Sequence, residues 1–455
     1  MSTLNMKPQM DKQRVIEYLK NYFTENSKAP QDHCVGAEFE LFALDSKGRS
    51  IPYSGEKGIH ELLIDLTDSS NLWVDGESID GNLINLDSSV GSITLEPSAQ
   101  IELSGRPCKN LFETQNDWNI YLNSIKLLAE KYNFELYGVG IHPFQAPNDL
   151  ELLPKPRYQI MNEHFKQTGS MGHWMMRCSA STQVTSDYNS IEDLFTKLHL
   201  SFKLTPFALA LFANSCFQNG KQSDYLCLRG LAWANTDQKR SGIPNEIFKE
   251  NLDVDILSHY LLQTPAMFQQ DGTTYSSANN KNFFEIHQQD LPNNKSLKEA
   301  IETHLSQIFT ETRVKSYIEF RTADAQSPKF QMSVPAFYKG IFNDQEALYE
   351  ASELLREFKP DDIQIIYQAV PLKALDTPAK DYTVLDITKK LLEIACKGLD
   401  RQAQTANLKR SEQVFLHPLM EIVFENSYCP AQYFLRSYEK DFNRNLHETL
   451  KISKY

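Results

Sequence analysis

Five glutamates and one arginine are the residues of this 455-residue chain whose types and spacing could carry out chemistry. They lie in short apolar stretches, and they are Glu38, Glu40, Glu96, Glu102, Glu319 and Arg321. Carboxylate ligands without His or Cys suit a hard cation such as Mg²⁺, with Mn²⁺ as an alternative, rather than zinc. Several carboxylates together with an arginine suit a phosphoryl group whose charge is neutralised by metal ions. The set therefore predicts a metal-assisted phosphoryl-transfer site.

Alternation of side chains along a strand would bring these charges to one face of a sheet. In VGAEFELFAL the apolar residues share one face, and Glu38 and Glu40 share the other. The stretches AQIELSG and KSYIEFR repeat the pattern, with Glu102 in the first and with Glu319 and Arg321 in the second. The polar face of a further predicted strand, SASTQVTSD, carries Ser179, Ser181, Gln183 and Asp187. If these strands form one sheet, its polar face gathers the carboxylates around the arginine.

A solvated sheet face is the alternative explanation, since antiparallel sheets commonly expose one polar face to water. Such a face usually mixes Lys, Thr and Glu, whereas Lys315 is the only lysine on the polar faces of these four stretches. Crowded carboxylates resist ionising together unless something positive neutralises them. The repeated glutamates therefore favour a cation site over a solvated face.

The elements that must position these residues place strands early and helices late. Helical spacing predicts helices over 9–25, 59–69, 110–132, 190–215 (kinked at Pro206), parts of 154–170, 245–268 and 296–309, and most of 335–455. Hairpins or loops are expected over 70–92, and strands over 35–44, 99–105, 134–141, 179–187 and 313–321. This order predicts an α+β unit with an antiparallel sheet rather than a doubly wound nucleotide-binding fold.

Composition narrows the classes of partner and the compartment. The net charge of −13 disfavours a general nucleic-acid or anionic-membrane binder, which needs surplus Lys and Arg. The seven cysteines form no CxxC pair, which favours free thiols in a reducing compartment. The N-terminus lacks the apolar core of a signal peptide, and the longest apolar run, FALALFA, is far below the roughly 20 residues that cross a bilayer. We expect a cytoplasmic protein.

No P-loop, G-x-G-x-x-G or G-x-S-x-G motif occurs in the chain, so those nucleotide-binding folds and a nucleophile elbow are not supported.

Seven stretches, in order from about residue 35 to 340, resemble the glutamate–cysteine ligases of the plant and proteobacterial type. They are VGAEFELFAL, ITLEPSAQIELSG, PRYQIMNEHFKQTGSMG, MMRCSASTQVTSDY, LTPFALALFANSCFQNGK, LRGLAWANTDQKRSG and SYIEFRTADAQ. The resemblance implies a curved antiparallel sheet that forms a funnel of the glutamine synthetase type, surrounded by helices, with a largely helical C-terminal layer. It divides the chain into a catalytic core, 1–345, and a helical portion of the same unit, 346–455.

The resemblance also implies the reaction and the role of each residue. ATP would phosphorylate the γ-carboxylate of L-glutamate, and the amine of L-cysteine would displace phosphate, which is the first step of glutathione biosynthesis. By this resemblance Arg321 and Glu319 are catalytic, and the metal ligands are Glu38, Glu40, Glu96, Glu102 and Glu319. The residues expected to bind the amino-acid substrates are Arg229, Trp233, Arg240 and Gln100. For Arg229 and Arg240 a surface ion pair is the alternative role.

Some positions depart from the family pattern, and other functions stay open at this point. Ser98 and Ala99 stand where the family often has glycines, Cys216 stands where proline is usual, and Arg177 is displaced by one position from the arginine of some members. A different acceptor amine, a phosphagen-type phosphotransferase and a non-catalytic ATP-binding descendant are the alternatives. The intact carboxylate set argues against the last of these. The chain is expected to be a monomer or a homodimer.

Overall fold

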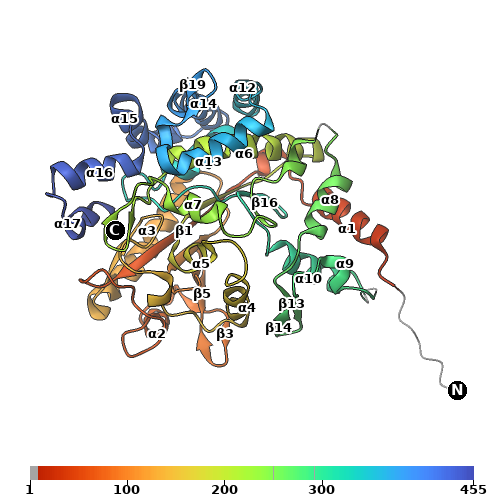
Figure 1. Cartoon of the computed structure of the whole chain (residues 1–455), viewed down its shortest axis with the longest axis horizontal. Coiled ribbons are helices and arrows are strands. Elements are labelled where there is room, and N and C mark those ends of the chain that lie inside the picture. Colours follow the sequence, from red (N-terminus) through yellow and green to blue (C-terminus); the bar gives the residue numbers. More distant parts are fainter. Residues whose placement is uncertain (1–8, 250, 290, 292) are drawn as a thin grey trace.

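A nine-stranded sheet runs through the centre of the protein (Figure 1), and all its strand pairings are antiparallel. The computed structural model describes residues 9–249, 251–289, 291 and 293–455. The strand order is β16 (Thr312–Val314), β17 (Ile318–Phe320), β9 (Thr182–Ser186), β1 (Val35–Leu44), β7 (Ile101–Gly105), β6 (Gly91–Leu95), β5 (Asn85–Ser88) and β2 (Val74–Asp75), and β8 (Glu135–Tyr137) pairs with the far end of β1. With its many helices, the chain has the predicted α+β architecture. Residues 1–8, the first part of the N-terminus in which the sequence shows no signal-peptide core, lie outside the described residues.

The register of this sheet lines up the predicted polar face. Glu38 lies opposite Gln183 of β9 on one side and opposite Ser104 of β7 on the other. Glu40 lies opposite Glu102 of β7. Antiparallel neighbours in register place their side chains on the same face. The alternation predicted from the sequence is confirmed for the strands that carry these glutamates.

Gly36 allows β1 and β9 to approach closely at the start of this face. A Cβ added at Gly36 would lie 2.5 Å from Oγ1 of Thr185, and the Gly36 N–H donates a hydrogen bond of 3.0 Å to that hydroxyl. A larger residue would displace the Thr185 side chain and break this hydrogen bond, or push the two strands apart. The small residue ahead of Glu38 and Glu40 therefore fixes the pairing that positions them.

Helices cover the apolar face of the sheet. Helix α3 (Leu111–Tyr132) contacts β1 and β7, and helix α11 (Ser333–Phe342) contacts β1 and β9. Helix α14 (Val384–Thr405) packs on α11 from the outer side, among the C-terminal helices drawn in blue in Figure 1. The apolar residues of β1 are almost completely excluded from solvent, which supplies the main stabilising term of this layer.

The remaining helices complete the shell. In the first half they are α1 (Lys12–Glu25), α2 (Ile59–Ser69), α4 (Pro156–His164), α5 (Gly172–Cys178), α6 (Ile191–Leu211) and α7 (Leu228–Ala234). In the second half they are α8 (Val254–Gln263), α9 (Phe283–Ile286), α10 (Asn294–Leu305), α12 (Gln345–Leu354), α13 (Pro360–Lys373), α15 (His417–Asn426), α16 (Pro430–Lys440) and α17 (Leu446–Leu450). None of the helices in the described part of the chain is both long and apolar enough to span a membrane.

Short strands and 3₁₀ turns connect these elements. The two-stranded pairings are β3 (Ser78–Ile79) with β4 (Asn82–Leu83), β10 (Phe217–Gln218) with β11 (Lys221–Gln222), β12 (Ser241–Gly242) with β15 (Phe309–Thr310), β13 (Phe268–Asp271) with β14 (Thr274–Ser277), and β18 (Pro378–Ala379) with β19 (Tyr382–Thr383). The 3₁₀ turns are Pro30–Asp32, Pro147–Asp149, Asn245–Phe248, Ala374–Asp376, Glu412–Phe415 and Lys451–Ser453.

Several predicted elements have different bounds in the structure. The single late strand expected over 313–321 is wrong: a turn, in which the Lys315 N–H bonds the Tyr317 carbonyl, folds this stretch into the hairpin β16–β17. The helix expected over 245–268 is a 3₁₀ turn, then α8, and then the start of β13. Helix α6 runs through Pro206 to Leu211, so the proline does not end it.

The C-terminal helices are tied directly to the elements around the sheet. The hydroxyl of Tyr367 in α13 donates a 2.5 Å hydrogen bond to Glu311, which precedes β16. The buried Glu412 accepts a 2.5 Å hydrogen bond from the ammonium of Lys339 in α11. The hydroxyl of Tyr455 donates to the carbonyl of Gln326 at 2.8 Å. These contacts join residues beyond 345 to the same core.

Candidate active site

A cavity of about 380 Å³ lies over the polar face of the sheet. Seven of the predicted site residues line it, and they are Glu38, Glu40, Glu96, Glu102, Arg229, Trp233 and Arg321. The further polar or charged lining residues include Glu77, Lys155, Arg157, Ser181, Gln183, Arg313 and Lys315. The cavity thus combines a wall of carboxylates with a set of cations, as a site for a phosphorylated substrate requires.

The carboxylate of Glu40 is held by donors from β9 and from the segment before it. The Ser181 N–H and hydroxyl each donate to it at 2.7 Å, and Nε2 of Gln183 donates at 2.9 Å. Burial and the nearby Glu96 nevertheless raise the pKa of Glu40 to about 7. A positive group bound close to Glu40 would therefore stabilise the charged form of this carboxylate.

The neighbouring glutamates have the same electrostatic problem. Burial and the nearby Glu319 raise the pKa of Glu38, and burial with Glu38, Glu96 and Glu40 raises that of Glu102 well above its ordinary value. The Ser104 hydroxyl donates a hydrogen bond to Glu102. Carboxylates that raise one another's pKa values in one cavity fit a divalent cation by the chemistry of the donor set.

Two of these carboxylates accept hydrogen bonds from protein donors, Glu40 from Ser181 and Gln183 and Glu102 from Ser104. Within the described residues, no group of three or more His, Cys, Asp or Glu side chains is arranged to hold a metal ion as it stands. A cation that binds these carboxylate oxygens would have to displace the donors or bind an oxygen beside them.

Glu319 has cationic partners on several sides and lies below the cavity wall. It is fully buried, accepts hydrogen bonds of 2.6 and 3.1 Å from Nε and Nη2 of Arg313, and bonds Nη1 of Arg321 at 3.1 Å. The ammonium of Lys315 lies 3.5 Å away. Burial by itself would raise the pKa of Glu319, but these cations outweigh it and hold the pKa far below the ordinary value.

Arg321 connects this ion-pair group to the carboxylate wall. Its Nη1 donates a 2.6 Å hydrogen bond to Oε1 of Gln183, whose Nε2 donates to Glu40. Its guanidinium carbon lies 5.5 Å from the centre of the Trp233 ring. In the described part of the chain its Nε has no hydrogen-bond partner. The arginine is therefore held by Gln183 and Glu319 through Nη1, while its Nε is buried without a partner.

Comparison with known proteins decides which family this arrangement belongs to. A family model described as glutamate–cysteine ligase family 2 matches residues 34–450. The chain belongs to glutamate–cysteine ligase family 2. This ligase is 30% identical over 442 residues to the chloroplastic glutamate–cysteine ligase A of Oryza sativa subsp. indica, a match that covers 96% of this chain and 87% of that protein. It is 29% identical over 437 residues to the chloroplastic glutamate–cysteine ligase of Arabidopsis thaliana, covering 94% and 81%.

A solved structure supports the fold of the ligase. The crystal structure of the glutamate–cysteine ligase of Francisella tularensis in complex with AMP superposes with a TM-score of 0.58 at 11% identity, covering 94% of this chain and 88% of that one. Family membership makes the chain an ATP-dependent glutamate–cysteine ligase of glutathione biosynthesis. The family and the activity that the seven stretches predicted are confirmed.

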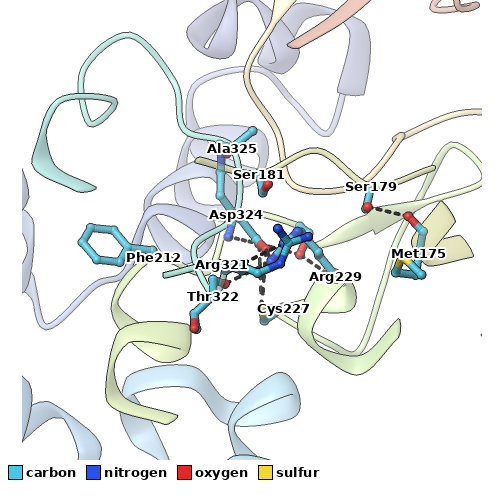
Figure 2. Close-up of polar contacts among 12 residues, drawn as sticks. Met175, Ser179, Ser181, Phe212, Cys227, Arg229, Arg321, Thr322, Asp324 and Ala325 are labelled. Carbon is cyan, nitrogen blue, oxygen red and sulfur yellow. Dashed lines mark hydrogen bonds and ion pairs between the residues drawn. The ribbon is translucent and has the colours of Figure 1, made fainter. Parts of the chain in front are cut away.

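Arg229 lines the cavity of the ligase, but both its Nη atoms are engaged (Figure 2). Nη1 donates to the carbonyl of Thr322 at 3.0 Å, and Nη2 donates to the carbonyl of Arg321 at 2.8 Å. Its guanidinium carbon lies 4.7 Å from the centre of the Trp233 ring. The ring of Trp233 therefore contacts both arginines, and its Nε1 is held by the Phe309 carbonyl at 2.7 Å.

Two predicted substrate-binding residues do not line the cavity. Arg240 donates from Nε to Asp237 at 2.7 Å and from Nη1 to the Pro265 carbonyl at 2.5 Å, and it is 1% exposed. Gln100 donates to the carbonyl of Ser179 at 2.9 Å and accepts from the Ser98 N–H at 3.0 Å. Arg240 therefore joins the Asp237 carboxylate to the backbone at Pro265, and Gln100 joins the backbone at Ser98 to the backbone at Ser179.

The turn that precedes Gln100 adopts a conformation that usually favours glycine. Ala99 has φ of +63°, and its N–H bonds the Glu96 carbonyl at 2.9 Å. A left-handed conformation is costly for a residue with a Cβ. The turn nevertheless has the tight shape that the glycines of the family would allow, with Ala99 in place of one of them.

The sequence prediction missed two cations that line the cavity, Lys155 and Arg157. Lys155 and Arg157 come from the start of α4, and both lie near the ring of Tyr158, at 5.6 and 5.1 Å from its centre. Burial and the neighbouring Arg157 lower the pKa of Lys155. The signal available was the alternation of basic residues with prolines in PKPRY, since each proline restricts the backbone that presents them.

Proposed function

We propose that the cavity binds ATP, L-glutamate and L-cysteine and makes γ-glutamylcysteine in two steps. In the first step, an oxygen of the glutamate γ-carboxylate attacks the γ-phosphorus of ATP, and ADP leaves. In the second step, the cysteine amine attacks the γ-carbonyl carbon of γ-glutamyl phosphate. Phosphate then leaves with the former carboxylate oxygen, and the amine loses a proton as the amide forms.

One observation carries this proposal: the hydrogen-bonded bridge from Glu40 through Gln183 to Arg321. The two hydrogen bonds of Gln183 measure 2.9 and 2.6 Å. They couple an acidic wall, suited to a cation, to the guanidinium of Arg321, which lines the cavity. With a cation on the acidic wall, an anionic phosphoryl group beside Arg321 would meet positive charge on both sides, and this preorganised charge lowers the barrier to its transfer.

The acidic wall supports a metal site of Mg²⁺ or Mn²⁺. Glu38, Glu40, Glu96 and Glu102 would hold it, and when bound it would neutralise charge on the phosphate oxygens. The raised pKa values of Glu38, Glu40 and Glu102 support this role. Glu319 is already neutralised by Arg313 and Arg321, so we propose that it orients Arg321 and takes no part as a ligand.

The basic wall supports binding of substrate carboxylates or of the ATP phosphates. Lys155 and Arg157 line the cavity from the start of α4, and both are near enough to Glu96 to interact with it electrostatically. A guanidinium matches a carboxylate or a phosphate with two parallel hydrogen bonds. We propose that Arg229 and Trp233 border the amino-acid end of the cavity.

The remaining features of the enzyme complete the proposal. The antiparallel sheet supports a funnel of the glutamine synthetase type, and residues 346–455 act as a helical layer of the same unit as 1–345. We propose that the enzyme is cytoplasmic and is a monomer or a homodimer, which sedimentation at several concentrations would distinguish.

The decisive assay measures ADP release with each amino acid alone and with pairs. Mg²⁺-dependent ADP formation should require L-glutamate and rise strongly when L-cysteine is added, and mass spectrometry should identify γ-glutamylcysteine. ADP formation that proceeds equally well without glutamate, or a clear preference for another amine, would refute the proposal.

A further inference from the structure

Asp324 is a buried carboxylate outside the cavity, three residues beyond Arg321, and it is 1% exposed. Its Oδ2 accepts hydrogen bonds from the Asn214 N–H at 2.7 Å and from the Ser215 hydroxyl at 2.6 Å. A Cβ added at Gly140 would lie 2.3 Å from its carboxyl carbon, so the side chain is packed tightly against that backbone. Asp324 therefore has one well-defined position.

Two routes lead from Asp324 to Arg229, as Figure 2 shows for the charged groups. Directly, Nη1 of Arg229 lies 4.0 Å from Oδ1 of Asp324. Indirectly, the Ser215 hydroxyl donates a hydrogen bond to Asp324 and accepts one from the backbone N–H of Arg229, at 3.1 Å. The carboxylate thus acts on the side chain of Arg229 electrostatically and on its backbone through Ser215.

Arg229 in turn holds the strand end that carries Arg321. Its two Nη atoms bond the carbonyls of Arg321 and Thr322, at 2.8 and 3.0 Å. The first carbonyl belongs to Arg321, whose side chain lines the cavity, and the second belongs to the next residue, Thr322. A guanidinium that grips two successive carbonyls limits rotation of the backbone between them.

We infer that Asp324 is a positioning residue for phosphoryl transfer, acting through Arg229 on Arg321. This inference rests on the proposed role of Arg321 beside the transferred phosphoryl group. Asp324 touches no substrate. Its charge and its hydrogen bond to Ser215 hold Arg229, and Arg229 holds the backbone from which Arg321 reaches the Gln183 bridge.

Among the described residues, three titratable groups interact with Asp324: Arg229, the thiol of Cys216 and the thiol of Cys227. Sγ of Cys227 lies 3.7 and 3.8 Å from the two carboxylate oxygens. A thiol is a weak donor, so the guanidinium is the main electrostatic partner of the carboxylate. Replacing Asp324 by Asn keeps the shape and one acceptor oxygen but removes the charge that acts on Arg229.

A double-mutant cycle tests the inference by measuring kcat and KM for Asp324→Asn, Arg229→Lys and the double variant. Asp324→Asn should lower kcat about 10-fold while KM for ATP changes less than about 2-fold. Added to Arg229→Lys, the same change should lower kcat by less than about 2-fold, because residues that act as one unit are not additive. Ser215→Ala, which removes only the indirect route, should lower kcat by a smaller factor. It also tests the inference if Asp324→Asn does not fold.

Glu412→Gln is the matched control, because Glu412 is a buried carboxylate paired with Lys339 away from the cavity. Its kcat should stay within about 2-fold of wild type, and its effect should multiply with that of Arg229→Lys. Independent effects of Asp324→Asn and Arg229→Lys on kcat, or a raised KM with unchanged kcat, would overturn the inference. Absence of glutamate-dependent ADP formation in the wild type would instead refute the proposed function and remove the basis of the inference.

Discussion

Arg313 and Glu319 form a two-pronged ion pair across the β16–β17 hairpin, with N–O distances of 2.6 and 3.1 Å. The two residues are directly opposite in the antiparallel register. Glu319 shares its Oε2 between Arg313 and Arg321. The position of Arg321 at the cavity therefore depends on how firmly Arg313 holds the other side of the same carboxylate.

The first prediction is that Arg313→Lys lowers kcat about 10-fold. Lysine keeps the charge but loses the planar fork, so Glu319 is released on one side and draws Arg321 away from Gln183. Steady-state ADP formation measures the effect. Arg401→Lys is the control, because Arg401 forms the same kind of two-pronged ion pair with Asp344 at a distant position in the chain. The kcat of this variant should be unchanged. Equal effects of the two substitutions would contradict the role of Arg313.

The second prediction concerns Arg321 itself. Arg321→Lys should lower kcat about 100-fold or more, the size expected for the loss of one transition-state donor. The circular dichroism spectrum should match that of the wild type, because the charge that pairs with Glu319 is kept. Turnover close to that of the wild type would exclude Arg321 from phosphoryl transfer.

The third prediction separates the stability of Glu40 from its function. Its pKa of about 7 is raised above the unfolded value, so its favourable contribution is present below the ordinary pKa of 4.5 and is lost as the pH rises through about 7. At pH 8 the ionised carboxylate therefore costs stability when no cation is bound. Glu40→Gln should melt at the same temperature as the wild type or higher at pH 8, and its advantage should shrink as the pH falls towards 5.

The same melts with Mg²⁺-ATP provide the functional half of this test. Ligand that binds only the folded state stabilises it by about 2.7 kcal/mol at 100 times its Kd. The wild type should show such a shift, whereas Glu40→Gln should lose most of it together with its turnover. An unaltered shift in the variant would rule out Glu40 as part of the metal site.

The fourth prediction assigns Arg240 to stability. Arg240 and Asp237 form a buried pair at 2.7 Å, and His164 bonds the same carboxylate at 2.9 Å. Arg240→Met removes the cation that neutralises the buried Asp237 carboxylate, and it should lower the free energy of unfolding by about 3 kcal/mol. The KM for glutamate of the folded fraction should be unchanged. Denaturant titration and initial rates measure the two quantities. A large rise in KM with normal stability would return Arg240 to the substrate site.

Local periodicity explains why much of the acidic wall could be predicted from the sequence. Glu38 and Glu40 alternate with apolar residues in β1, and that alternation requires nothing beyond the strand itself. The partners of Glu319 could not be predicted, because a turn within the expected strand brings Arg313 opposite it. Arg229 and Arg240 lie in the same sequence stretch, but α7 ends between them. As a result Arg229 lines the cavity and Arg240 does not. Lys155 and Arg157 reach the cavity from the start of α4, and strand and helix periods do not show which distant element a helix start will face.

The most direct test of the central claim follows an oxygen atom. L-glutamate labelled with ¹⁸O in its γ-carboxylate is incubated with enzyme, Mg²⁺-ATP and L-cysteine, and the released phosphate is analysed by mass spectrometry. If the γ-carboxylate attacks ATP and the amine then displaces phosphate, each phosphate released should carry one ¹⁸O atom from the carboxylate. Unlabelled phosphate, released at the rate of γ-glutamylcysteine formation, would contradict the account.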